Sequence, residues 1–190
     1  MTQEIQMEIL LVAVLLMQLG GLAAVVLIDP YIRRECRKTM LVIVFLIFLL
    51  LVRDLAAHQL DLVGTMPYRR TLCAIFGYIL RPVLIILYLY IVQPKGRYTA
   101  AWILAGINAA VYLTAIFSGI CFSIDADNVF HRGPLGYTTH IICIVLLIYN
   151  LWMTIREYGG IRKKESVIPI AVTGLVMIAA ISDSVVDYRD

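Results

Sequence analysis

Six long apolar runs decide what this chain can fold into. Crossing the hydrocarbon core of a bilayer takes about 20 mostly apolar residues in helical form, and each run is long enough. They extend over Met7–Ile28, Thr39–Leu60, Thr71–Val92, Thr99–Phe122, Leu135–Ile155 and Ser166–Val186. The alternating segments of about ten residues that a transmembrane barrel needs are missing. The sequence therefore predicts an all-α fold, a polytopic transmembrane helix bundle of six helices.

Composition agrees with a membrane-embedded chain. Of the 190 residues, 62% are hydrophobic and 15% are charged, whereas soluble domains average about 45–50% and about 25%. Turn signals such as Asp29-Pro30 and Gly133-Pro134 separate the runs. The N-terminus lacks the basic segment and cleavage site of a signal peptide, so we expect its apolar run to be retained. Residues 1–190 are predicted to form a single membrane-embedded domain.

The distribution of lysine predicts an orientation. Lys38, Lys95, Lys163 and Lys164 all fall in the first, third or fifth connection between apolar runs. Positive residues favour the cytoplasmic side of a membrane, so the odd connections are predicted to be cytoplasmic. The N-terminus and the C-terminus then lie outside. Trp102 and Trp152 fall near the cytoplasmic ends of their helices, where interfacial aromatic residues are common.

Arg81 is the sharpest polar feature inside an apolar run. It lies roughly 15 Å along the helix from Thr71, near the middle of the bilayer. A charged residue there costs about 2.5–3.5 kcal/mol on insertion scales, so Arg81 needs an anion or carbonyl groups. Pro82 follows it and removes a main-chain hydrogen bond, which predicts a kink. Both a structural ion pair and a ligand contact are consistent with this position.

Other polar residues are predicted to gather in the outer half of the bundle. Asp54, His58 and Asp61 form one stripe of their helix by spacing, and Asp54 is the natural partner for Arg81. A polar cluster that opens to the outside would suit a small ligand, although several of these groups could simply face water. The candidate ligand-binding residues are Asp54, His58, Arg81, Asn108, Tyr137, His140 and Asp183.

Metal and nucleophile chemistry have no pattern to support them. Cys36, Cys73, Cys121 and Cys143 show no CxxC spacing, and the three histidines show neither HxxxH nor HExxH spacing. Ser118 has no evident base beside it, as a hydrolase would need. We expect no catalytic residue, no metal and no cofactor.

The segment from Trp102 to Tyr158 carries a family likeness. Its FHRGPLGYTTH stretch, with Arg132, Pro134, Tyr137 and His140, resembles the membrane sensor region of bacterial histidine kinases and diguanylate cyclases of the seven-helix type. The likeness extends over about residues 99–188 and includes Pro169. That family has a seventh helix leading to a cytoplasmic kinase or cyclase, which this chain does not contain. The resemblance implies a truncated or separately encoded sensor region, without enzyme activity of its own.

The resemblance and the polar cluster lead to one expectation and two alternatives. We expect a multi-pass protein of the bacterial cytoplasmic membrane that acts as the sensor or input part of a two-component signal transduction system. A small ligand or a membrane cue in the outer half would favour one packing of the helices. Its partners would be the lipid bilayer, a small molecule, and a signalling protein or a second copy, but not nucleic acid. The alternatives are a small transporter or permease subunit and an accessory structural membrane protein.

Overall fold

The computed structural model describes residues 2–63, 67–125, 129–157, 171 and 174, and contains five long helices and one small hairpin in these ranges. The helices are α1 (Thr2–Ile28), α2 (Arg34–Val63), α3 (Pro67–Val92), α4 (Thr99–Leu113) and α5 (Thr138–Glu157). Between α4 and α5 come the 3₁₀ turn η1 (Thr114–Ile116) and the strands β1 (Phe122–Ile124) and β2 (Phe130–Arg132).

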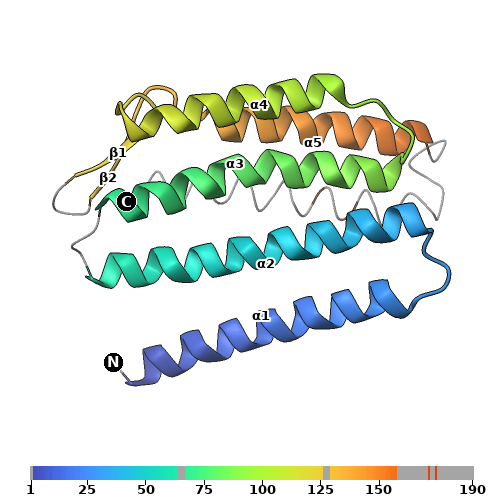
Figure 1. Cartoon of the computed structure of the whole chain (residues 1–190), viewed down its shortest axis with the longest axis horizontal. Helices are drawn as coiled ribbons and strands as arrows, with labels where there is room; N and C mark the ends of the chain where they lie inside the picture. Colours follow the sequence, from blue (N-terminus) through green and yellow to red (C-terminus); the bar gives the residue numbers. More distant parts are fainter. Residues whose placement is uncertain (1, 64–66, 126–128, 158–170, 172–173, 175–190) are drawn as a thin grey trace.

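Consecutive helices run antiparallel to one another, and α3 lies between the others (Figure 1). Helix α1 packs on α2, and α2 packs on α3. Helix α3 then contacts both α4 and α5, which also contact each other. The antiparallel hairpin β1–β2 lies at the end of the bundle where α3 begins and α4 ends (Figure 1). Helix α3 therefore connects the peripheral pair α1–α2 to the more compact group α4–α5.

All five helices are long and apolar enough to cross a membrane. Their outward surfaces are apolar too, as shown by Met17 of α1, which is 77% exposed. Exposed apolar side chains on such helices suit contact with lipid rather than water. The expectation of a mainly helical chain with helices of membrane length is therefore confirmed. The predicted sixth helix, Ser166–Val186, lies outside the described residues except at positions 171 and 174.

The buried core lies between α3, α4 and α5. Small residues bring α4 close to its neighbours, because Ala101 and Ala105 are both buried and lie four residues apart on one face. Larger side chains of α3 and α5 fill the space around them, and they are Ile85, Ile86, Leu89, Ile142, Cys143, Leu146 and Leu147. This arrangement follows the rule that small residues let membrane helices approach one another closely.

Several predicted helix ends differ from the structure. Helices α1, α2 and α3 begin at Thr2, Arg34 and Pro67, before their predicted starts, and the largest difference is at the end of α4. Helix α4 ends at Leu113 rather than at Phe122, and side-chain hydroxyl groups bond to main-chain carbonyls at this end and just beyond it. Thr114 donates its hydroxyl hydrogen to the carbonyl of Val111 at 2.6 Å, and Ser118 donates to the carbonyl of Thr114 at 3.1 Å. The fifth helix begins at Thr138 rather than at Leu135, after a turn at Pro134–Tyr137. The hairpin β1–β2 was not expected from the sequence.

Candidate functional site

Pro82 leaves one carbonyl of α3 without its helical donor. In an α-helix each N–H donates to the carbonyl four residues earlier, and proline has no N–H. The carbonyl concerned belongs to Tyr78, which is buried, as is Pro82. Leaving a buried carbonyl unpaired costs about 1–3 kcal/mol. Helix α3 nevertheless continues through Pro82 without interruption, so another donor is needed at this depth.

Asn108 supplies that donor from α4, and Thr139 of α5 holds the Asn108 side chain in place. Asn108 of α4 donates from its side-chain amide to the carbonyl of Tyr78 at 3.0 Å. Thr139 of α5 donates its hydroxyl hydrogen to Oδ1 of Asn108 at 2.8 Å, and the same hydroxyl lies 3.4 Å from the Tyr78 carbonyl. Both side chains are fully enclosed, at 0% and 1% exposure. We call this contact of three helices the proline junction.

A stack of aromatic rings lies beside the proline junction. The rings of Tyr78 and Tyr112 stack with their centroids 4.5 Å apart, and Phe122 of β1 lies 5.8 Å from the Tyr78 ring. The hydroxyl of Tyr112 donates to the carbonyl of Gly136 at 2.7 Å. The stack therefore links α3 and α4 to the hairpin and to the turn that precedes α5.

A series of ring and cation contacts leads from this stack toward the surface. The Arg81 guanidinium lies 5.4 Å from the centre of the Tyr78 ring. The His140 ring lies 6.3 Å from that of Tyr78 and 6.2 Å from that of Tyr137. The Arg132 guanidinium lies 4.6 Å from the centre of the Tyr137 ring, well within the range of a cation–π interaction. These five residues form the aromatic–cation chain, whose outer member Tyr137 is 40% exposed.

Backbone contacts fix Arg132 at the outer end of this chain. In the hairpin, Arg132 pairs with Phe122. The next residue, Gly133, donates its N–H to the carbonyl of Cys121 at 2.8 Å. A Cβ atom at Gly133 would collide with the carbonyls of Gly119 and Ile120. Glycine is therefore required at this position, and it holds the hairpin against the start of α5.

Four of the predicted ligand-binding residues are brought together. Arg81, Tyr137 and His140 belong to the aromatic–cation chain, and Asn108 belongs to the proline junction beside it. Asn108 uses one amide hydrogen and its Oδ1 within the junction, which gives it a structural role there. Thr139 was missed, since nothing in the sequence pointed to its hydroxyl. That the carbonyl of Tyr78 lacks its helical donor could have been predicted from the sequence, because Tyr78 lies four residues before a proline inside a helix.

The predicted ion pair between Asp54 and Arg81 is wrong. Asp54 pairs with the neighbouring Arg53 instead. Arg53 also reaches α3, where its Nε donates to the carbonyl of Cys73 at 3.0 Å and its guanidinium lies where a Cβ at Gly77 would be. Arg53 thus connects α2 to α3 and holds the carboxylate of Asp54 at the surface of α2.

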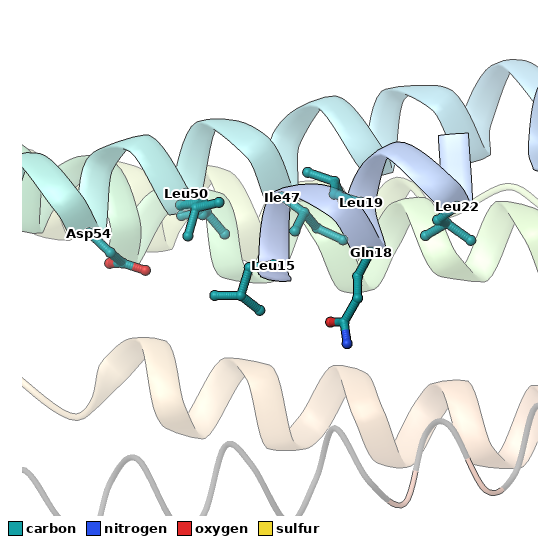
Figure 2. Close-up of a pocket in the computed structure, with 8 residues that line it drawn as sticks. Leu15, Gln18, Leu19, Leu22, Ile47, Leu50 and Asp54 are labelled. Carbon is teal, nitrogen blue, oxygen red and sulfur yellow. The ribbon is translucent and has the colours of Figure 1, made fainter. Parts of the chain in front are cut away.

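Asp54 and His58 are exposed on α2, and Asp54 is turned away from the aromatic–cation chain. It lines a groove of about 320 Å³ between α1 and α2, together with Gln18 and a set of leucine and isoleucine side chains (Figure 2). Asp183, the remaining candidate, lies outside the described residues, as does the side chain of Asp61. The described part of the candidate site is therefore built by α3, α4, α5 and the hairpin.

The donor set at this site suits anion binding more than metal binding. Among the described residues, no group of three or more His, Cys, Asp and Glu side chains could hold a metal ion. The aromatic–cation chain instead offers two guanidinium groups, an imidazole and a tyrosine hydroxyl, which can donate hydrogen bonds to an anion. No family model, curated protein or solved structure matches this chain.

Proposed function

We propose that this chain is the membrane-embedded sensor or input region of a bacterial signal transduction protein, and that it binds a small anion at the outer end of the aromatic–cation chain. The observation that supports this most directly is the path of contacts from Arg132 to the carbonyl of Tyr78. The family likeness of the RGP stretch, with Tyr137 and His140, points the same way.

The proposed binding site uses charges that the fold already holds in position. Arg132 and Tyr137 sit at the more exposed end of the path, and Arg81 sits at its inner end. Both guanidinium groups lie against aromatic rings, which limits their rotamers before a ligand arrives. Groups held in advance bind an anion with a smaller loss of conformational entropy.

The proposed output passes through the proline junction. A ligand that pulls on Arg132 or Tyr137 changes the packing of His140 against Tyr78. The carbonyl of Tyr78 is held by side chains of α4 and α5 rather than by its own helix. A change there alters how three helices meet, which is the kind of element that can adopt two packings. The differential affinity of the ligand for the two packings would set the size of the response.

Ligand-induced thermal stabilisation tests this proposal on the full chain in neutral detergent. Small carboxylates, phosphates and sulfates are screened, and a ligand at about 100 times its Kd should stabilise the folded state by about 2.7 kcal/mol. Arg81→Ala and Arg132→Ala are expected to abolish the rise in Tm. Arg69→Ala is the matched control, because Arg69 is exposed in the first turn of the same helix α3.

Three further measurements keep the outcome interpretable. Tyr137→Leu removes the ring under Arg132 while keeping both guanidinium groups, and it should lower the affinity for the anion without removing binding. Each variant is first compared without ligand, so that lost folding is distinguished from lost binding. A stabilising anion that acts equally on Arg81→Ala and Arg132→Ala would refute the proposed site. Flux of the same anion into liposomes carrying the chain would assign a transporter instead of a sensor.

A further inference from the structure

A polar cavity lies at the end of the bundle opposite the proposed sensor site, which does not use it. Its volume is about 480 Å³. It lies between the turn that joins α3 to α4 and the last turns of α5. The lining residues that matter here are Arg97, Tyr98, Tyr149, Trp152, Arg156 and Glu157. By the lysine count this end is the predicted cytoplasmic one.

The charge of this cavity is positive. Arg97 comes from the turn and Arg156 from the last turn of α5, and both side chains are exposed. Glu157 is the acidic residue in the lining, so two guanidinium groups face one carboxylate. Neither arginine forms an ion pair within the described ranges of the chain. Arg156 lies over the ring of Trp152 at 5.5 Å, which orients it without neutralising it.

A rigid aromatic wall forms one side of the cavity. The hydroxyl of Tyr98 lies 3.1 Å from the carbonyl of Leu89 and 3.0 Å from that of Gln93, and it donates its hydrogen to them. Its ring packs edge-on against Tyr90 at 4.8 Å. Burial raises the pKa of the Tyr98 hydroxyl to about 12, so this group stays neutral and adds no negative charge near neutral pH.

The rim of the cavity reaches the lipid-facing surface of α5. Trp152 is 52% exposed, and Tyr149 beside it is also exposed, with their ring centroids 5.9 Å apart. Exposed tryptophan and tyrosine next to arginine is the composition found where membrane proteins meet lipid headgroups. Ile148, on the same helix, is 54% exposed and offers an apolar surface for an acyl chain.

We propose that this cavity binds a phosphate-bearing anion between Arg97 and Arg156, either the headgroup of an anionic phospholipid or a soluble phosphate ester. Guanidinium groups recognise phosphate oxygens by charge-assisted hydrogen bonds. Trp152 would lie beside the bound phosphate, and Tyr98 would form the uncharged wall of the site. A headgroup bound here would fix the end of α5 against the turn that follows α3.

Tryptophan fluorescence measures this binding directly. The chain contains two tryptophans, so Trp102→Phe leaves Trp152 as the single reporter. Brominated phosphatidylglycerol in neutral micelles should quench Trp152 at a lower mole fraction than brominated phosphatidylcholine. The double variant Arg97→Ala with Arg156→Ala should weaken the preference about tenfold or more, since charge-assisted contacts are lost. Replacing both arginines by lysine should keep most of it.

A matched control and a soluble ligand separate the outcomes. Arg33→Ala with Arg34→Ala removes the same charge from the same end of the bundle, but outside the cavity, and should leave the preference unchanged. A preference for phosphatidylglycerol that depends on Arg97 and Arg156 assigns a lipid headgroup. Equal quenching by both lipids, with thermal stabilisation by glycerol phosphate that depends on the two arginines, assigns a soluble phosphate ester. If neither effect depends on Arg97 and Arg156, the inference is wrong, and the sensor proposal is unaffected because it concerns the other end.

Discussion

At the scale of single residues, the most informative feature is the way Pro82 is accommodated. A proline inside a helix costs about 3 kcal/mol through its missing donor and its steric clash. Here part of that cost is removed, because Asn108 donates to the carbonyl of Tyr78 and Thr139 holds the Asn108 side chain in place. The proline therefore turns an intrahelical hydrogen bond into contacts between helices. The contacts of Asn108 are then part of the fold, whatever ligand binds nearby.

A double-mutant cycle tests this account of Pro82. Asn108→Ala should destabilise the chain by about 1–3 kcal/mol, since it leaves the Tyr78 carbonyl without its amide donor. In a Pro82→Ala background, the substituted residue offers its own main-chain N–H to that carbonyl, so Asn108→Ala should cost less. Unfolding of the four proteins in one detergent gives the coupling energy, expected at about 0.5–3 kcal/mol. Penalties that simply add would show that Asn108 does not replace the missing helical donor.

Asp54 shows why one residue-level expectation failed. The predicted depth of the two residues in the membrane suggests that Asp54 pairs with Arg81, because each needs an opposite charge in the outer half of the bundle. Adjacent residues of a helix do not normally face one another, so spacing does not suggest Arg53 as the partner. The long side chain of Arg53 can nevertheless turn back to its neighbour while its Nε reaches the carbonyl of Cys73. The choice between two partners at similar depth depends on helix rotation, which spacing along the chain does not specify.

At the scale of elements, the hairpin and the turn before α5 carry the outer half of the site. Their strands have only three residues each, too short for an alternating pattern to be recognised. The apolar run that predicted a helix to Phe122 contains Thr114 and Ser118, whose hydroxyl groups bond main-chain carbonyls of the preceding turn. The sequence predicts a chain break at Gly133-Pro134. It does not predict that Gly133 lies against the backbone of Gly119 and Ile120, because this contact arises from tertiary packing.

Gly133→Ala is predicted to disrupt this outer element. The added Cβ would meet the carbonyls of Gly119 and Ile120, and backbone cannot move aside as a flexible side chain can. We expect a loss of stability of about 1–3 kcal/mol, as for other overpacked sites, together with weaker anion binding through Arg132.

Gly106→Ala is the matched control for this substitution. Apart from its chain neighbours and the nearby backbone of α4 itself, no heavy atom of the described residues lies within 4 Å of a Cβ built at Gly106. Alanine there should be neutral or stabilising by up to about 1 kcal/mol, because it favours the helix. Thermal unfolding of both variants in the same detergent provides the comparison. Equal stability of Gly133→Ala and the parent would contradict the close backbone approach at the hairpin.

At the scale of the whole molecule, hydropathy predicted the class of fold and the approximate position of every described helix. This succeeds because a membrane helix must satisfy its own backbone hydrogen bonds, which leaves few alternatives for a long apolar run. It does not specify which faces meet. The meeting of Tyr78, Asn108 and Thr139 depends on the packing of α3 against α4 and α5, and their shared polarity was only a partial signal. Arg97 and Arg156 likewise come together only in the folded bundle.

The orientation of the molecule is the prediction that connects its two polar ends. The lysine distribution predicts that the hairpin faces the outside and that the turn between α3 and α4 faces the cytoplasm. In a background with the four native cysteines replaced, Ser123→Cys in β1 and Lys95→Cys in the turn place one exposed thiol at each end. A membrane-impermeant maleimide should label Ser123→Cys in intact cells, and Lys95→Cys only after the membrane is opened.

Both thiols are exposed and neither residue belongs to the proposed sites, so a difference in labelling reports the side of the membrane rather than burial. The result decides what each site can meet. With the hairpin outside, the aromatic–cation chain samples ligands from the environment. The cavity between Arg97 and Arg156 then faces the anionic cytoplasmic leaflet, whose surface potential of about −30 mV attracts the two arginines. Labelling in the reverse pattern would place Arg132 and Tyr137 in the cytoplasm, and the proposed sensor would then respond to an internal anion.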